Sequence, residues 1–252
     1  MLALFHCNGR SNRAPLWVGV AVTLALCLTG VDAVHGAAPA KAETSQPSTS
    51  TSYYLRTTRP KALDAMGCRF GRGVHAGKQP TDALVVMAFG RPRRKWGIHG
   101  ASLFGVRFAS VSTIRDAGVA FAGGFHRCVR HGQHSVRIVL GTSNFGPGVS
   151  YRHGQAWAEM VNQANERIAK RGWEERIEFA GGNDIELTWN GPKRTRAWVR
   201  GYDSVNRWPY YDFGDAAGCP PYGRCAGAWT LEDVWYVAWG APPAIPLPEI
   251  YT

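Results

Sequence analysis

Hydrophobic positions along the chain fall into short continuous runs that alternate with longer amphipathic stretches. Continuous apolar runs bounded by glycine or polar residues are typical of strands that are covered on both faces. Several of these runs end in polar residues, as at Thr142, Ser143 and Asn144. The strand-like runs lie at 83–90, 118–125, 135–144, 176–186, 208–219 and 243–252.

Three amphipathic stretches predict helices. The longest, 153–173, places apolar residues at helical spacing on one face and ends near Gly172. The segment 192–205 begins with Pro192, a residue well suited to the first helical position. In 230–240, Thr230 precedes Asp233 by three residues, which approximates a capping box.

Alternating strands and helices indicate an α/β fold with a mainly parallel sheet. No glycine-rich nucleotide loop follows the first strand at 83–90, which favours a (β/α) TIM-like barrel over an open doubly wound sheet. A full barrel needs about eight strands. Either two strands lie hidden in irregular segments, or the barrel is incomplete at the C-terminus, where the chain stops just after a strand-like run.

The first 42 residues predict a secretory signal peptide. Arg10 and Arg13 precede an apolar stretch at 16–28, which is short for a membrane span, and small residues follow up to Ala42. An uncleaved anchor is the alternative. A Ser/Thr-rich linker is expected at 43–60, and the folded domain at 61–252. The mature protein is therefore expected to be secreted or held at the cell surface, without a stable membrane span.

Cysteine usage fits an extracellular location. Cys7 and Cys27 fall in the predicted signal peptide, which leaves an even number of four. An even count outside the cell suggests two disulfides, most naturally a short-range pair and a long-range pair, although two other connectivities stay open. The favoured pairs are Cys219 with Cys225, and Cys68 with Cys128.

The formal net charge of +11 favours anionic partners such as cell-wall polymers. No nucleic-acid motif accompanies this charge, so nucleic acid is not expected as a partner, and the basic cluster at 91–95 is interpreted as a solvated loop. His126, His131 and His134 surround Cys128, but their spacing fits no zinc pattern. No metal and no cofactor are expected.

Two acids stand at the end of the strand-like run 176–186. Residues i and i+2 of a strand share a face, so Asp184 and Glu186 are expected to project together from the carboxyl end of the sheet. Glycosidic cleavage uses one protonated and one ionised carboxyl group. We predict Glu186 as general acid, Asp184 as the assisting carboxylate, and Asp215 as a further nucleophile or base. The alternative is a pair of solvated loop acids.

Substrate-binding candidates lie at neighbouring strand ends. Trp189 and either Tyr210 or Tyr211 could offer flat apolar faces to sugar rings. Asn144, which ends another strand, could donate a hydrogen bond to a substrate.

The Asp-x-Glu pattern at the end of a middle strand resembles secreted glycoside hydrolases, notably the family-25 lysozymes and, more distantly, chitinase-type enzymes. The stretches 181–202, 210–220 and 229–251 also resemble an uncharacterised group of secreted bacterial barrel proteins. The lysozyme resemblance implies muramidase chemistry on peptidoglycan, with Glu186 as acid and Asp184 assisting. The lysozymes' first-strand aspartate has no match here, and Arg91 stands in that region.

These patterns predict a secreted glycoside-hydrolase-like protein that cleaves a cell-wall or extracellular polysaccharide by carboxylate general-acid catalysis. Two alternatives stay open. The same barrel could bind a glycan without turnover, or the chain could be an inactive fragment whose missing strands would complete the site. A second well-placed carboxylate would distinguish catalysis from binding.

Overall fold

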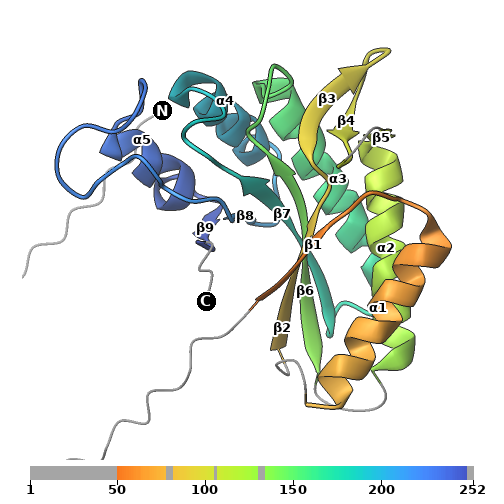
Figure 1. The fold of residues 1–252 in the computed structure, drawn as a ribbon. Helices are drawn as coiled ribbons and strands as arrows, with labels where there is room; N and C mark the ends of the chain where they lie inside the picture. Colours follow the sequence, from red (N-terminus) through yellow and green to blue (C-terminus); the bar gives the residue numbers. More distant parts are fainter. Residues whose placement is uncertain (1–49, 78–81, 105–106, 130–133, 249–252) are drawn as a thin grey trace, which may run out of the picture. The chain divides into compact units, whose positions relative to one another are not determined.

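The computed structural model of the chain describes residues 50–77, 82–104, 107–129 and 134–248 (Figure 1). The predicted signal peptide, the linker up to residue 49 and His131 lie outside these residues. No helix in the described ranges is long and apolar enough to cross a membrane.

The main sheet of the described residues contains six strands, all paired in parallel. They are β1 (Ser50–Tyr54), β2 (Asp82–Ala88), β6 (Ser135–Ser143), β7 (Ile177–Asp184), β8 (Tyr210–Asp212) and β9 (Ala244–Pro246). Their order in the sheet is β1-β2-β6-β7-β8-β9, which is also their order along the chain. The parallel α/β sheet that the alternating pattern predicted is therefore present.

Helical segments connect each strand to the next (Figure 1). They are α1 (Pro60–His75), α2 (Val111–Cys128), α3 (Tyr151–Ala169), α4 (Pro192–Asp203), the short α5 (Leu231–Trp235) and the π-helical turn η1 (Tyr236–Gly240). The strand order never reverses, so the described sheet has no topological switch point of the kind that defines a doubly wound fold. Among the described strands, β1 and β9 form the edges, and the sheet does not close into a barrel.

The two faces of the sheet differ in what covers them. One face packs against the helices and forms a large core that contains Phe121, Trp157 and Trp198, all fully buried. The opposite face carries a smaller cluster in which Val86, Val139 and Ala180 lie side by side in register. The apolar runs therefore follow from burial on both faces, as expected of parallel strands.

The run 118–125 is not a strand, contrary to the prediction, but part of α2. Ser110 caps this helix by accepting a hydrogen bond from the Thr113 amide at 3.1 Å. The buried residues Ile114, Phe121 and Phe125 recur at helical spacing along α2. A short apolar run fits a buried helix as well as a buried strand, and here the upstream cap and packing against α1 select the helix.

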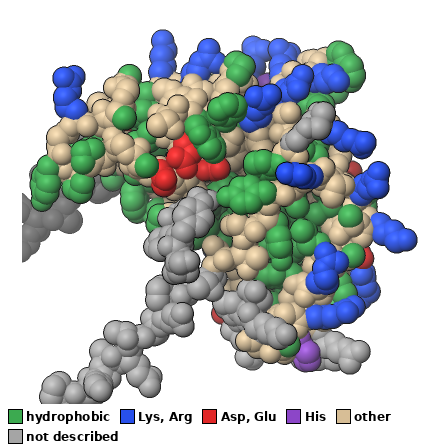
Figure 2. All heavy atoms as spheres, in the orientation of Figure 1, with side chains coloured by type: hydrophobic (Ala, Val, Ile, Leu, Met, Phe, Trp, Pro, Cys, Tyr) green, Lys and Arg blue, Asp and Glu red, His purple; other side chains and the backbone are tan. Residues whose placement is uncertain are grey.

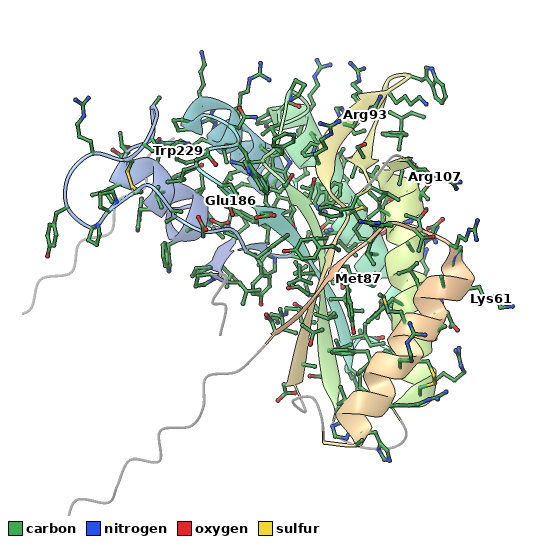
Figure 3. The ribbon with its side chains drawn as sticks, in the orientation of Figure 1. Lys61, Met87, Arg93, Arg107, Glu186 and Trp229 are labelled. Carbon is green, nitrogen blue, oxygen red and sulfur yellow. A yellow bond between two sulfur atoms is a disulfide. The ribbon has the colours of Figure 1, made fainter. Side chains whose placement is uncertain are left out.

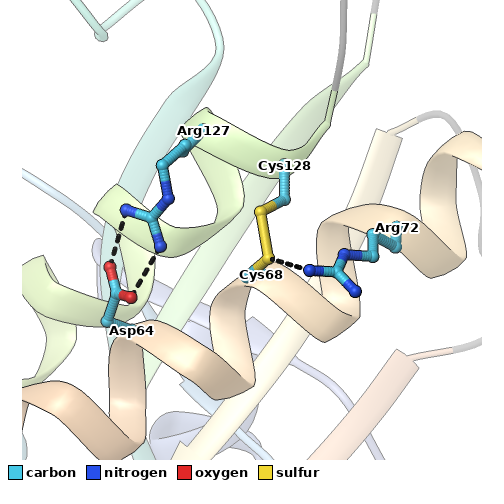
Figure 4. Close-up of a disulfide and its surroundings, with 5 residues drawn as sticks. All are labelled: Asp64, Cys68, Arg72, Arg127 and Cys128. Carbon is cyan, nitrogen blue, oxygen red and sulfur yellow. Dashed lines mark hydrogen bonds and ion pairs between the residues drawn. A yellow bond between two sulfur atoms is a disulfide. The ribbon is translucent and has the colours of Figure 1, made fainter.

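Glycines allow α1 and α2 to cross at very short range. A Cβ atom placed on Gly67 would lie 1.9 Å from the Phe121 carbonyl oxygen, and one on Gly124 would lie 1.9 Å from that of Asp64. Next to this crossing, Cys68 of α1 is bonded to Cys128 of α2, with Cα atoms 5.0 Å apart (Figure 4). The second favoured disulfide, Cys219–Cys225, is also formed.

Two further segments differ from the sequence interpretation. β1 lies within the stretch assigned to a linker, and it is an edge strand whose residues alternate between exposed and partly buried. The basic cluster 91–95 is the strand β3 (Arg91–Lys95), not a loop. It pairs with β4 (Ile98–Ser102), which pairs in turn with β5 (Phe108–Ser110), in an antiparallel three-stranded sheet. A tight turn with positive φ at Trp96 and Gly97 joins β3 to β4.

The predicted helices at 153–173 and 192–205 correspond to α3 and α4. Thr230 and Asp233 form the predicted capping box in full, since each side chain accepts the other residue's backbone amide. The predicted helix 230–240 is divided in the structure into α5 and η1.

Candidate functional site

Polar residues end three neighbouring strands at one edge of the sheet. Ser143 of β6 pairs with Asp184 of β7, and Asn183 of β7 pairs with Asp212 of β8. Parallel pairing aligns the carboxyl ends of these strands, so side chains far apart in sequence are brought together. Of the site candidates, Asp184 is the last residue of β7, the fourth strand of the sheet, and Glu186 lies two residues beyond it.

Asp184 and Glu186 have different environments. Asp184 is the last residue of β7, and its side chain is largely buried, with 8% of the residue exposed. Glu186 lies beyond the strand and is partly exposed (Figure 3). Its carboxylate Oε1 accepts a hydrogen bond from the Asp215 amide at 3.4 Å. The structure therefore brings Asp215 to Glu186 through its backbone, whereas the Asp215 carboxylate accepts the Ala217 amide at 2.7 Å.

Asn144 fixes the backbone of Glu186. Its Nδ2 donates to the Glu186 carbonyl at 2.9 Å, and its Oδ1 accepts the Glu186 amide at 3.1 Å. Asn144 is fully buried, so it cannot reach a substrate in the way the sequence suggested. Its amide instead holds the catalytic candidate in place from the neighbouring strand.

Asp212 is a third acid at this edge, and it was not singled out from the sequence. Burial raises its pKa well above the ordinary value, and the charges of Asp184 and Glu186 raise it further, against the lowering effect of hydrogen bonds from the Gly214 and Ile185 amides. Burial and the neighbouring acids thus favour the protonated form of the Asp212 carboxyl group over the ionised form. Its position inside the strand-like run 208–219, directly after Tyr210 and Tyr211, was the available sequence signal.

Replacing Asp212 by asparagine is expected to change the pH dependence of stability. A carboxyl group whose folded-state pKa is raised stabilises the fold below the ordinary pKa near 3.8, and this contribution is lost as pH rises toward the folded-state pKa. The wild-type free energy of unfolding should therefore fall relative to D212N by up to about 1.4 kcal/mol per pH unit above about pH 4. Urea unfolding at several pH values measures this difference, and parallel curves for the two proteins would contradict it.

A cavity of about 500 Å³ opens beside Asp184. Aromatic rings of Phe104, Phe145 and Trp189 line it, each of them 36–42% exposed. Phe145 and Trp189 pack edge to face, with ring centroids 5.7 Å apart. Trp189, which the sequence suggested as a ring for stacking on a sugar, lines this cavity. Flat, partly exposed rings next to polar groups are typical of ligand pockets.

The two predicted tyrosines lie elsewhere. Tyr210 is fully buried among Trp198 and Tyr202, and its hydroxyl donates to the Val237 carbonyl oxygen. Tyr211 is on the face away from the helices, 5% exposed, and its hydroxyl accepts from Arg137 at 2.7 Å. Alternation along β8 sends these adjacent rings to opposite faces, and neither lines the cavity.

Charge is unevenly distributed around the site. Figure 2 shows Asp and Glu side chains gathered near the middle of the viewed face, with Lys and Arg along its upper margin and right side. Arg91 and Arg93 line the same cavity as Asp184. The site therefore combines acids at the strand ends with cations from β3.

No group of three or more His, Cys, Asp or Glu side chains in the described ranges is arranged to hold a metal ion. Cys128 is oxidised, and His126 stacks on Trp173 with ring centroids 4.6 Å apart. We compared the chain with protein-family models and with curated proteins, and no match was found.

Proposed function

We propose that this chain is a secreted glycoside-hydrolase-like protein that acts on a cell-wall or extracellular polysaccharide. One observation carries the proposal. Asp184, Glu186 and Asp212 lie close together at the carboxyl edge of the sheet, next to an aromatic-lined cavity. The consecutive order of the parallel strands supports an incomplete TIM-like barrel, and two disulfides are compatible with secretion.

The three acids supply the carboxyl groups that glycosidic cleavage needs. Burial, and then the nearby carboxyl groups of Asp184 and Glu186, favour the protonated form of Asp212, so the three acids do not readily ionise together. Glu186 is the most exposed of the three and is assigned as the general acid that protonates the leaving oxygen. Asp184 lines the cavity and is assigned to stabilise positive charge on the sugar. Peptidoglycan is the substrate that the lysozyme resemblance implies.

The experiment is release of reducing ends from a panel of purified peptidoglycan, chitin fragments and uronate polymers. D184N is expected to release product about 100-fold more slowly than the wild type, since a charge next to the developing cation is removed. E159Q is the matched control, because Glu159 is exposed on α3. Absence of release from every polymer by the wild-type protein would contradict hydrolysis.

Glycan binding without turnover is the second candidate, and one observation favours it. Of the three acids, Asp184 alone is among the residues that line the cavity. A sugar bound against the aromatic rings of this cavity could therefore lie out of contact with Glu186. Retention of a glycan by the protein, with no reducing ends released, would support this candidate.

A further inference from the structure

Two arginine side chains from one strand line the aromatic cavity. Arg91 and Arg93 are both exposed, and residues two positions apart on a strand project from the same side. The intervening Pro92 is buried beneath them. Among the described residues that line this cavity, the charged ones are these two arginines and Asp184, so their positive charge exceeds their negative charge.

These guanidinium groups differ from other arginines of the described ranges. Arg115, Arg127 and Arg137 each form an ion pair with a carboxylate, whereas no ion pair in the described part of the chain involves Arg91 or Arg93. Arg91 lies over the Phe145 ring, 5.7 Å from its centroid. Two cations that converge on a concave, partly apolar site concentrate positive potential there, which favours an anionic ligand.

The strand that carries the arginines is held firmly. A Cβ atom on Gly148 would lie 2.1 Å from the Pro92 carbonyl oxygen, so β3 packs directly against the loop after β6. The paired strand β4 is anchored by His153, which is fully buried. Its Nδ1 accepts the Trp198 indole N–H at 2.9 Å, which leaves Nε2–H to donate to the Gly100 carbonyl at 2.9 Å.

Burial lowers the His153 pKa to about 4, so the ring is neutral near pH 7 and this arrangement persists. The two arginines are thus presented by a fixed platform. A preorganised site loses little conformational entropy when a ligand binds.

We propose that the cavity binds a sugar residue that carries a free carboxylate, held by Arg91 and Arg93 while its ring lies against Trp189 and Phe145. This inference rests on the proposed glycan function and names its substrate class. Guanidinium groups match the planar geometry of a carboxylate and can bind it in bidentate fashion. Because Asp184 lines the same cavity and repels anions, the carboxylate lies on the β3 side and the glycosidic bond on the acid side.

The test measures binding rather than turnover. Uronate tetrasaccharides from galacturonan, alginate and hyaluronan are titrated into the purified full-length protein by calorimetry, each beside its carboxyl-reduced form. Salt is set at about 0.15 M, where the Debye length is about 8 Å, so that distant charges contribute little. At least one acidic tetrasaccharide is expected to bind 10-fold or more tightly than its reduced form, on the order of one charge-assisted hydrogen bond.

Substitutions identify which cations are responsible. R91Q and R93Q are each expected to weaken binding of that tetrasaccharide about 10-fold, and the double variant about 100-fold. R94Q is the matched control, because Arg94 is exposed on the same strand, does not line the cavity, and donates from Nε to the Gly97 carbonyl at 3.1 Å. Equal losses in R94Q and R93Q would overturn the proposal, as would equal affinity for acidic and reduced sugars.

Failure of this proposal can be separated from failure of the proposed hydrolysis. Arginine-dependent binding of an acidic sugar without released reducing ends would refute hydrolysis and leave the anionic subsite standing. Hydrolysis of a glycan, together with equal affinity of the protein for acidic and carboxyl-reduced sugars, would refute the anionic subsite and leave the hydrolase standing.

Discussion

Replacing Glu186 by glutamine is expected to slow glycan hydrolysis by about 10²- to 10⁴-fold, the usual contribution of a general acid. Glutamine keeps the size of the side chain and an oxygen that can accept the Asp215 amide, but it cannot supply a proton. Asn144 binds the main chain of residue 186, so the position of the backbone should not change. Steady-state rates of reducing-end release on the preferred polysaccharide measure the effect.

A second substrate makes this test specific to acid catalysis. An aryl glycoside whose phenol is a good leaving group needs little protonation, so the difference between E186Q and wild type should become much smaller. Circular dichroism and the urea midpoint serve as controls for folding. If E186Q hydrolysed the polysaccharide at the wild-type rate, Glu186 would not be the general acid.

Removing the disulfide between Cys68 and Cys128 is expected to give the largest loss of stability among the changes considered. The bond joins residues 60 positions apart, and the chain-entropy relation gives about 4 kcal/mol for a closed loop of that size. Cys68 is also 7% exposed beside the close crossing of α1 and α2, so its replacement disturbs packing. Urea unfolding of the C68S/C128S variant under non-reducing conditions measures the loss.

The second disulfide provides a matched comparison. Cys219 and Cys225 are 6 positions apart, for which the same relation gives about 2 kcal/mol. The Asp64–Arg127 ion pair beside the longer bond is solvent-exposed and should add little (Figure 4). A smaller loss for C68S/C128S than for C219S/C225S would show that loop closure does not govern the stability of this crossing.

The sequence by itself determined the features that depend on neighbouring residues. The strands β2, β6 and β7, the helices α3 and α4, and the capping box at Thr230 follow from periodicity and from local hydrogen bonding. Both favoured disulfide pairs are formed as well. This pairing could be predicted because four cysteines allow only three connectivities. The same patterns placed Asp184 and Glu186 at the carboxyl end of a strand.

Only the tertiary structure decided features that depend on distant contacts. The local sequence of the run 118–125 is compatible with either a strand or a helix. The close packing of Gly124 against α1 favours the helix. The sequence of β1 has no strong hydrophobic pattern, because few side chains of this edge strand are buried. Asp212 gains its raised pKa from burial and from acids on another strand, and periodicity along β8 does not report that proximity.

The same reason applies to Arg91 and Arg93, which sequence patterns assigned to a solvated loop. Antiparallel pairing of β3 with β4 and close contact with Gly148 bring them to the cavity that Asp184 lines. A charge run defines how polar a segment is, but not which cavity it faces. That choice is made by long-range pairing, which brings together residues nearly a hundred positions apart in the chain.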